Sequence, residues 1–201
     1  MTEIPGGSLA DSAREAVLAA GRALEDSGWE VSEAQPPELE RVSEIWAGVM
    51  NMDFQPILEQ LSGVMSDRLV QALQATFENF DFTPAQVLEM HMDRNRISRA
   101  WSGFFDQYPV VVGPTWTDIQ FHHDADLEVP DGMQLVMNRL RFITPANVLG
   151  LPSVAVPTGV HEGLPTGVQV YADKWREDLA LGGGEAIEAA LGRVCPIDPC
   201  F

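Results

Sequence analysis

Four potential metal ligands lie close together in the segment HHDAD: His122, His123, Asp124 and Asp126. Imidazole and carboxylate groups suit zinc or iron. Neighbouring residues of an extended loop point in opposite directions, so His122 and His123 are poorly placed to bind one ion. We therefore expect a solvated acidic loop. A metalloenzyme built on His122, His123 and Asp124 is the alternative.

The remaining reactive side chains are few. Arg96 and Arg99 lie one turn apart in a helical segment, where they can bind an anion or, as we expect, pair with nearby carboxylates. Lys174 is the only lysine, and Cys195 and Cys200 are the only cysteines. Two cysteines cannot form a disulfide framework or a four-thiolate zinc site. The order of the residues indicates no Ser-His-Asp or Cys-His arrangement.

The acidic composition excludes two classes of partner. The 201 residues carry a formal net charge of −18. Nucleic-acid binding needs Lys and Arg on a common face, and an anionic membrane repels such a chain. No apolar run approaches the roughly 18 residues of a spanning helix, and the first residues lack the pattern of a signal peptide. We expect a cytoplasmic protein that binds neither nucleic acid nor membranes.

Helical segments that alternate with β-branched ones predict an α/β fold in which helices cover a sheet. Asp81 is the expected cap of a helix that starts near Pro84. Three glycines at 182–184 predict that the last helix is short or bent. The predicted helices are 9–26, several between 38 and 106, 133–149 and 177–191, and the predicted strands are 29–31, 110–112, 153–156 and 167–171.

The order of these elements implies a strand that the sequence does not supply. The first predicted helix leads directly into the strand Trp29–Val31, as if another strand came before it. Sheets of this kind have covered faces and few long open edges. We therefore expect an exposed edge that pairs with another chain.

The most patterned stretch is NVLGLPSVAVPTGVHEGLPTGVQVYA, residues 147–172, in which proline and glycine recur every few residues. It resembles the C-terminal signature of the amidase signature hydrolases: a helix end with Asn, then Gly-Leu-Pro, a strand, Pro-Thr-Gly, a loop ending in Gly-Leu-Pro-Thr-Gly-Val-Gln, and a second strand. FDQYPVVVGPTW resembles the family's hydrophobic strand with its Pro-Thr end, and PIDP at 196–199 suits the family's tail. The resemblance is close across 142–181 and loose across 40–108.

The resemblance implies hydrolysis of an amide bond without a metal or organic cofactor. In the family, a buried neutral lysine acts through a bridging serine on a nucleophilic serine, and backbone N–H groups stabilise the oxyanion. These residues belong to the family's N-terminal half. Here Lys174 follows the last signature strand, no Ser-Ser pair occurs, and PGGS at 5–8 continues into Leu9. We expect no catalytic residue in this chain, so whether it is itself an enzyme stays open.

The resemblance implies that residues 1–201 form one C-terminal amidase-like region, with a partial sheet of mixed strands flanked by helices. Such a region carries part of the pocket for a small amide, and the acidic loop lies near the substrate entrance. The expected partners are an N-terminal amidase half or a second copy of the chain. The alternative is a non-catalytic split-gene subunit or an inactive paralogue. The residues expected at the pocket are Thr115, Trp116, Asn147, Pro157, Thr158 and Gly159.

The analysis of the acidic loop gives a first prediction. If HHDAD is a solvated loop, treatment with a metal chelator will leave the fold and the thermal midpoint of the purified protein unchanged. Circular dichroism melts with and without chelator measure this. A large loss of stability, with stoichiometric zinc or iron in the untreated protein, would support the metalloenzyme alternative, because metal binding contributes directly to folding.

Overall fold

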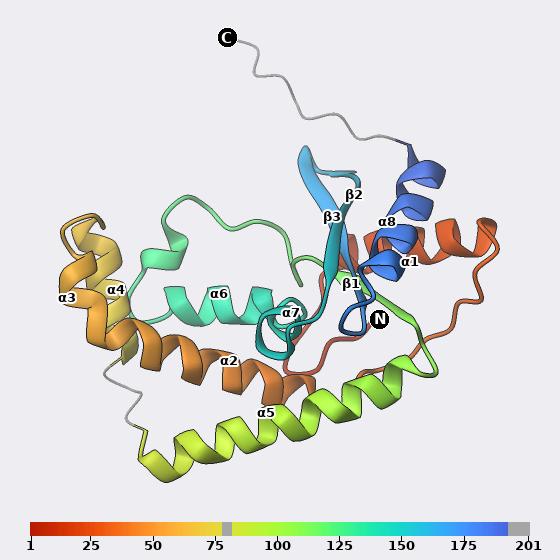
Figure 1. Ribbon diagram of the computed structural model, residues 1–201. Coiled ribbons are helices and arrows are strands. Elements are labelled where there is room, and N and C mark those ends of the chain that lie inside the picture. The colour runs from red at the N-terminus through yellow and green to blue at the C-terminus, as the bar shows by residue number, and fades with distance from the viewer. Residues whose placement is uncertain (78–81, 193–201) are drawn as a thin grey trace.

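The computed structural model describes residues 1–77 and 82–192. In these ranges, helices surround a small sheet in a mixed α/β fold (Figure 1). The helices are α1 (Asp11–Asp26), α2 (Leu39–Phe54), α3 (Leu58–Leu61), α4 (Asp67–Phe77), α5 (Pro84–Phe105), α6 (Gly132–Leu140), α7 (Thr144–Leu149) and α8 (Glu177–Leu191), with 3-10 turns η1 (Gln55–Ile57) and η2 (Ala125–Leu127). The strands are β1 (Val110–Pro114), β2 (Ser153–His161) and β3 (Leu164–Ala172).

The sheet formed by these residues has three strands in the order β1-β3-β2, and both pairs are antiparallel. β2 and β3 form a hairpin around Glu162 and Gly163, whose φ angles of 49° and 82° suit the tight two-residue turn of a hairpin. The predicted strands 153–156 and 167–171 are therefore too short. Most of the segment predicted as a loop continues the hairpin, with an irregularity between Pro157 and Gly159.

One face of the sheet is covered by α1 and α8, which lie together in Figure 1. Val110 and Val112 point to this face, where they pack with Val168 and Val170 of β3 against apolar residues of both helices. The glycines of α8 allow a close approach, because a Cβ on Gly184 would lie 2.9 Å from Cγ1 of Val154. The helix runs without interruption over the predicted range, 177 to 191, so its three glycines do not shorten it.

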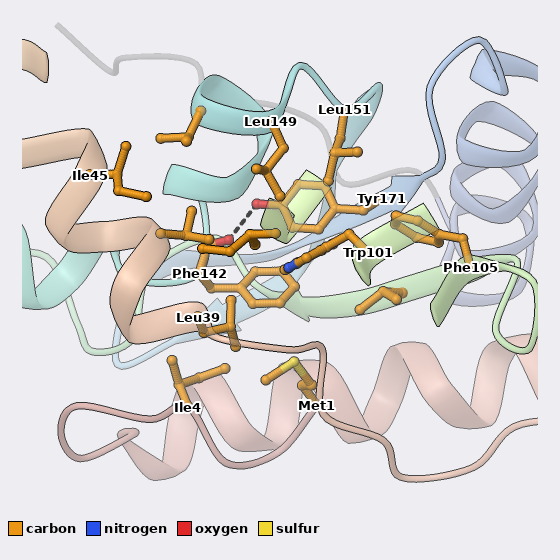
Figure 2. Packing of buried hydrophobic residues seen from close by; sticks show 14 of the residues in the cluster. Met1, Ile4, Leu39, Ile45, Trp101, Phe105, Phe142, Leu149, Leu151 and Tyr171 are labelled. Atoms are coloured by element: carbon orange, nitrogen blue, oxygen red, sulfur yellow. Dashed lines mark hydrogen bonds between the residues drawn. The ribbon is translucent and has the colours of Figure 1, made fainter. Parts of the chain in front are cut away.

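The opposite face packs on α2, α5 and α7 (Figure 2). Its centre is formed by Trp101, Phe142 and Tyr171, all fully buried. The rings of Phe142 and Tyr171 stack with centroids 4.9 Å apart, and the Tyr171 hydroxyl donates to the carbonyl oxygen of Phe142. The Trp101 indole donates to the carbonyl of Pro37 over 2.8 Å. The polar atoms of two large core residues are thereby satisfied without water.

Two predicted elements differ from the structure. Residues Trp29–Val31 follow the positive-φ Gly28 but pair with no strand, since none of the described strands lies beside them. The helix predicted over 133–149 is divided into α6 and α7, because Pro145 has no N–H and its ring would clash with the carbonyl of residue 141 in a continuous helix.

The helical prediction for 38–106 is confirmed, as is the start of α5 at Pro84. The cap of α5 is Thr83, whose hydroxyl accepts from the N–H of Gln86 while the Gln86 side chain accepts from the N–H of Thr83. Asp81, the predicted cap, lies outside the described residues. Cys195, Cys200 and the PIDP segment lie outside them too. Among the helices of the described ranges, none combines the length and the apolar character needed to cross a membrane.

The packing of Phe142 against β1 gives a prediction about stability. A Cβ on Gly113 would lie 2.4 Å from Cζ of Phe142, so Gly113→Ala must displace a buried ring. We expect a loss of about 1–3 kcal/mol in the free energy of unfolding, measured by chemical denaturation. Gly103→Ala is the control, because Gly103 lies in α5 with nothing within 4 Å of an added Cβ. The control should be neutral or stabilising by up to about 1 kcal/mol. Equal effects of the two substitutions would contradict this account of the core.

Candidate functional site

A pocket of about 280 Å³ lies where the end of β1 meets the hairpin and the start of α1. Its walls come from the segment that follows β1, from the middle of β2, from the first half of β3 and from two small residues of α1, Ser12 and Ala13. Apolar side chains form most of the lining: Trp116, Ile119, Val156, Pro157, Leu164 and Pro165. A small apolar group of a ligand fits such a surface.

The segment after β1 is held in place by backbone hydrogen bonds. The N–H of Thr115 donates to the carbonyl of Gly167, which extends the pairing of β1 with β3 by one residue. Thr117 is buried, and its hydroxyl donates to the carbonyl of Asn138 over 2.8 Å. The carbonyl of Thr117 accepts from the N–H of Ala10, directly before α1. Trp116 is thus fixed between two anchored threonines.

The Trp116 ring contacts Phe121 edge to face, with centroids 5.6 Å apart. This contact joins Trp116 to the loop that follows it, and Asp118, Ile119 and Gln120 of that loop line the pocket. The side-chain amide of Gln120 donates to the carbonyl of Pro165 over 2.8 Å, so the loop is also tied to the hairpin. Asp118 lines the pocket and forms an ion pair with Arg139, so the carboxylate of Asp118 has a partner.

Three of the six residues expected at the pocket line it: Thr115, Trp116 and Pro157. Thr158 and Gly159 follow Pro157 in β2, and the Thr158 hydroxyl lies 3.3 Å from that of Thr166, but neither residue is part of the lining. Asn147 is exposed on α7, where its amide donates to the carbonyl of Ile143, and it does not reach this pocket.

The sequence interpretation missed the contribution of the hairpin. His161, which no sequence pattern marks as a site residue, is half-buried and lines the pocket together with Leu164 and Pro165. These residues reach the pocket because β2 and β3 are longer than predicted. The two-residue signal Glu162-Gly163 between β-branched runs is typical of a hairpin and would have revealed this extension.

The other candidate groups lie away from the pocket. In the acidic loop, Asp124 pairs with Arg68 and with His123. Within the part of the chain that the structure describes, no three His, Cys, Asp or Glu side chains come together as a metal site. Arg96 pairs with Glu38 and Asp93, as expected for that helix. The bond from Arg96 holds the pKa of the Glu38 carboxyl below its usual value, and bonds from Arg41 and then Arg96 do the same for Asp93.

Lys174 follows β3 and is half-buried. Its amino group donates to the hydroxyl of Ser98 over 2.6 Å. Neither residue lines the pocket beside Trp116. A serine and a lysine in contact can act as nucleophile and base only next to a site that binds substrate and stabilises an oxyanion. The pair therefore has a structural explanation as a bond between α5 and the end of β3.

Known proteins resemble this chain in sequence and in fold. The family model described as Amidase matches residues 1–181. An indoleacetamide hydrolase of Bradyrhizobium japonicum is 34% identical over 194 residues, which are 90% of this chain and 40% of that protein. The solved structure of a fatty acid amide hydrolase has a TM-score of 0.77 at 17% identity, over 96% of this chain and 39% of that one.

A 6-aminohexanoate cyclic dimer hydrolase has a TM-score of 0.69 at 20% identity, over 93% of this chain and 43% of that one. At these identities the solved structures show a shared fold. The chain thus spans well under half the length of each of these relatives. The family match and the identity to the indoleacetamide hydrolase go further than the fold: this chain belongs to the amidase family.

Proposed function

We propose that residues 1–201 form the C-terminal part of an amide hydrolase and supply the wall of its pocket for the acyl group of a small-molecule amide. The observation that carries the proposal is the apolar pocket beside Trp116, in a chain that is 34% identical to an indoleacetamide hydrolase. The reaction is cleavage of a carbon–nitrogen bond. Its nucleophile and base come from a part of the fold outside these residues.

The lining of the pocket favours an aromatic or bulky apolar acyl group. Trp116 presents an aromatic ring, and two prolines with Leu164 form flat apolar walls. Aromatic pairs contribute about 0.5–1.5 kcal/mol beyond the area that they bury. The relative's name specifies an indole ring joined to an acetamide, and a ring of this kind suits the chemistry of the lining. Thr115 and the half-buried His161 supply polar groups at the edge of the pocket.

The chain itself contributes no catalytic group in this proposal. It acts as a C-terminal portion, either of a longer polypeptide or as a separate subunit that joins a chain with the serines and the lysine. We place it in the cytoplasm, since two cysteines in 201 residues give no disulfide framework of the kind typical of small secreted domains. The DNA immediately upstream of the codon for Met1 separates these two forms from an inactive paralogue that acts alone. A segment there that encodes Gly-Gly-Ser-Ser-Gly supports either form over an inactive stand-alone paralogue.

Binding of an aromatic amide tests the proposal. Titration of the chain with indole-3-acetamide, followed by ligand-observed NMR, should show weak saturable binding, and acetamide should show none. Trp116→Ala should raise the dissociation constant by between about two- and tenfold, because it removes the aromatic contact. Trp175→Ala is the matched control, since Trp175 is 86% exposed and lies outside the pocket. Equal affinity of the two variants, or binding of acetamide as tight as that of the indole compound, would contradict the proposal.

A further inference from the structure

The outer edge of β1 presents backbone hydrogen-bonding groups to another strand. In an antiparallel strand, alternate residues direct their N–H and C=O toward one neighbour or the other. The carbonyl of Val112 accepts from the amino group of Met1 over 2.7 Å, so residue 112 faces away from β3, and Val110 faces the same way. Pro114 occupies the next outward position, where a missing N–H costs no bond to β3. Met1 thus bonds to β1 as a neighbouring strand would.

A cavity of about 630 Å³ runs along this edge. β1 forms one wall, α1 forms the second, and the unpaired segment 29–34 forms the third. The Glu33 side chain accepts from the N–H of Thr2 over 2.7 Å, so the first two residues of the chain lie between β1 and this segment. Beyond Met1, the cavity extends along the same gap between β1 and segment 29–34.

The walls of the cavity combine an apolar surface with the open strand edge. Val17, Trp29 and Val110 contribute buried or half-buried apolar atoms. Leu18 of α1 and Val31 of the unpaired segment are 43% and 38% exposed, which leaves two large apolar side chains of the lining partly in water. With the Val112 carbonyl bonded to Met1, Val110 is the outward residue that remains for pairing, and backbone groups beside apolar side chains are what a β-strand needs for pairing and burial.

We propose that this cavity binds one β-strand from the polypeptide that carries the remainder of the amidase fold. That strand pairs with β1 at Val110 and covers Leu18 and Val31. The proposal rests on the proposed function, because it names the surface through which the missing catalytic part joins this chain. The coverage of the relative supports this choice of occupant. The match to the indoleacetamide hydrolase takes in 90% of this chain but 40% of that protein, so the larger part of that protein lies outside the match and can supply the strand.

The charges around the cavity specify the strand further. Glu25, Glu30 and Glu33 line it together with two cationic groups among the described lining residues, the Arg22 guanidinium and the amino group of Met1. The chain as a whole carries −18. A strand that has apolar residues in its middle and Lys or Arg at its ends complements this surface, and the attraction between them weakens as salt screens it.

Co-expression tests the proposal with a defined probe. The tagged 201-residue chain is produced together with the part of the Bradyrhizobium japonicum indoleacetamide hydrolase that precedes its matched region. We expect the two to co-purify in equal amounts, with slower amide hydrogen exchange in 110–112 of this chain than in the chain alone. Leu18→Glu and Val31→Glu should each reduce the co-purified partner about tenfold or more, because an unpaired carboxylate would be buried against an apolar strand. Leu88→Glu is the control, since Leu88 is 61% exposed on α5 and remote from the cavity.

The outcomes separate the two proposals. Thermal melts of each variant alone show that the fold is intact, which is expected because the substituted residues are partly exposed. Absence of co-purification, equal loss in the Leu88→Glu control, or a second copy of this chain on β1 would overturn the strand proposal. Binding of indole-3-acetamide beside Trp116 is measured separately. If that binding persists while the partner fails to dock, the strand proposal fails and the function stands. If the partner docks at β1 without any pocket binding, the function fails and the docking surface stands.

Discussion

The ring of Phe142 fills the space that a side chain at residue 113 would occupy, and most of the structure depends on this contact. Phe142 lies in the turn between α6 and α7, so its burial draws that turn under β1 and β3 at once. Its carbonyl also accepts from the buried hydroxyl of Tyr171. Burial raises the pKa of that hydroxyl well above its usual value, so it stays a neutral donor. One residue thus ties a helical turn to two strands.

The position of the pocket follows from this contact. The tip of the Phe142 ring packs against Gly113 in β1, and two residues later Thr115 bonds to Gly167 of the hairpin, which places Thr115 and Trp116 at the pocket. The hydroxyl of Thr117 and its backbone groups then bind α6 and the start of α1, so the loop has little freedom in which to move Trp116. The packing of a glycine in the core therefore sets the geometry of the apolar wall proposed to bind the acyl group.

Much of this fold could be predicted from local sequence patterns. The amphipathic repeats and Gly-Pro boundaries gave α1, α5, α8 and the core of each strand, since these signals act within one element. The division of α6 from α7 was missed even though Pro145 signals it, because the apolar pattern continues across the break. Trp29–Val31 has the composition of a strand, but a strand forms only where a neighbour supplies hydrogen bonds, and no described strand does so.

The site was predictable only in part for a similar reason. Thr115, Trp116 and Pro157 adjoin strand ends that the family resemblance located, and they line the pocket. Ile119 and His161 reach it through the fold of the loop and the full length of the hairpin, which depend on contacts between distant segments. Asn147 lies at a recognisable helix end, yet that end packs on the other side of the sheet, with α2.

Two features of this chain thus have separate expected roles. The pocket beside Trp116 offers an apolar wall for substrate, and the edge of β1 offers a place for the part of the fold that performs the chemistry. Neither feature contains a serine and lysine arranged for attack on an amide. The central claim is that amide hydrolysis requires residues outside 1–201.

Release of ammonia from indole-3-acetamide tests that claim most directly. The purified chain is compared with the same chain joined to the N-terminal part of the Bradyrhizobium japonicum indoleacetamide hydrolase, each with and without Lys174→Ala. The account predicts that the chain alone releases ammonia no faster than buffer does, that the joined protein turns over, and that Lys174→Ala leaves both results unchanged. Turnover by the chain alone that persists through repeated purification and is unchanged in the Lys174→Ala variant would contradict it.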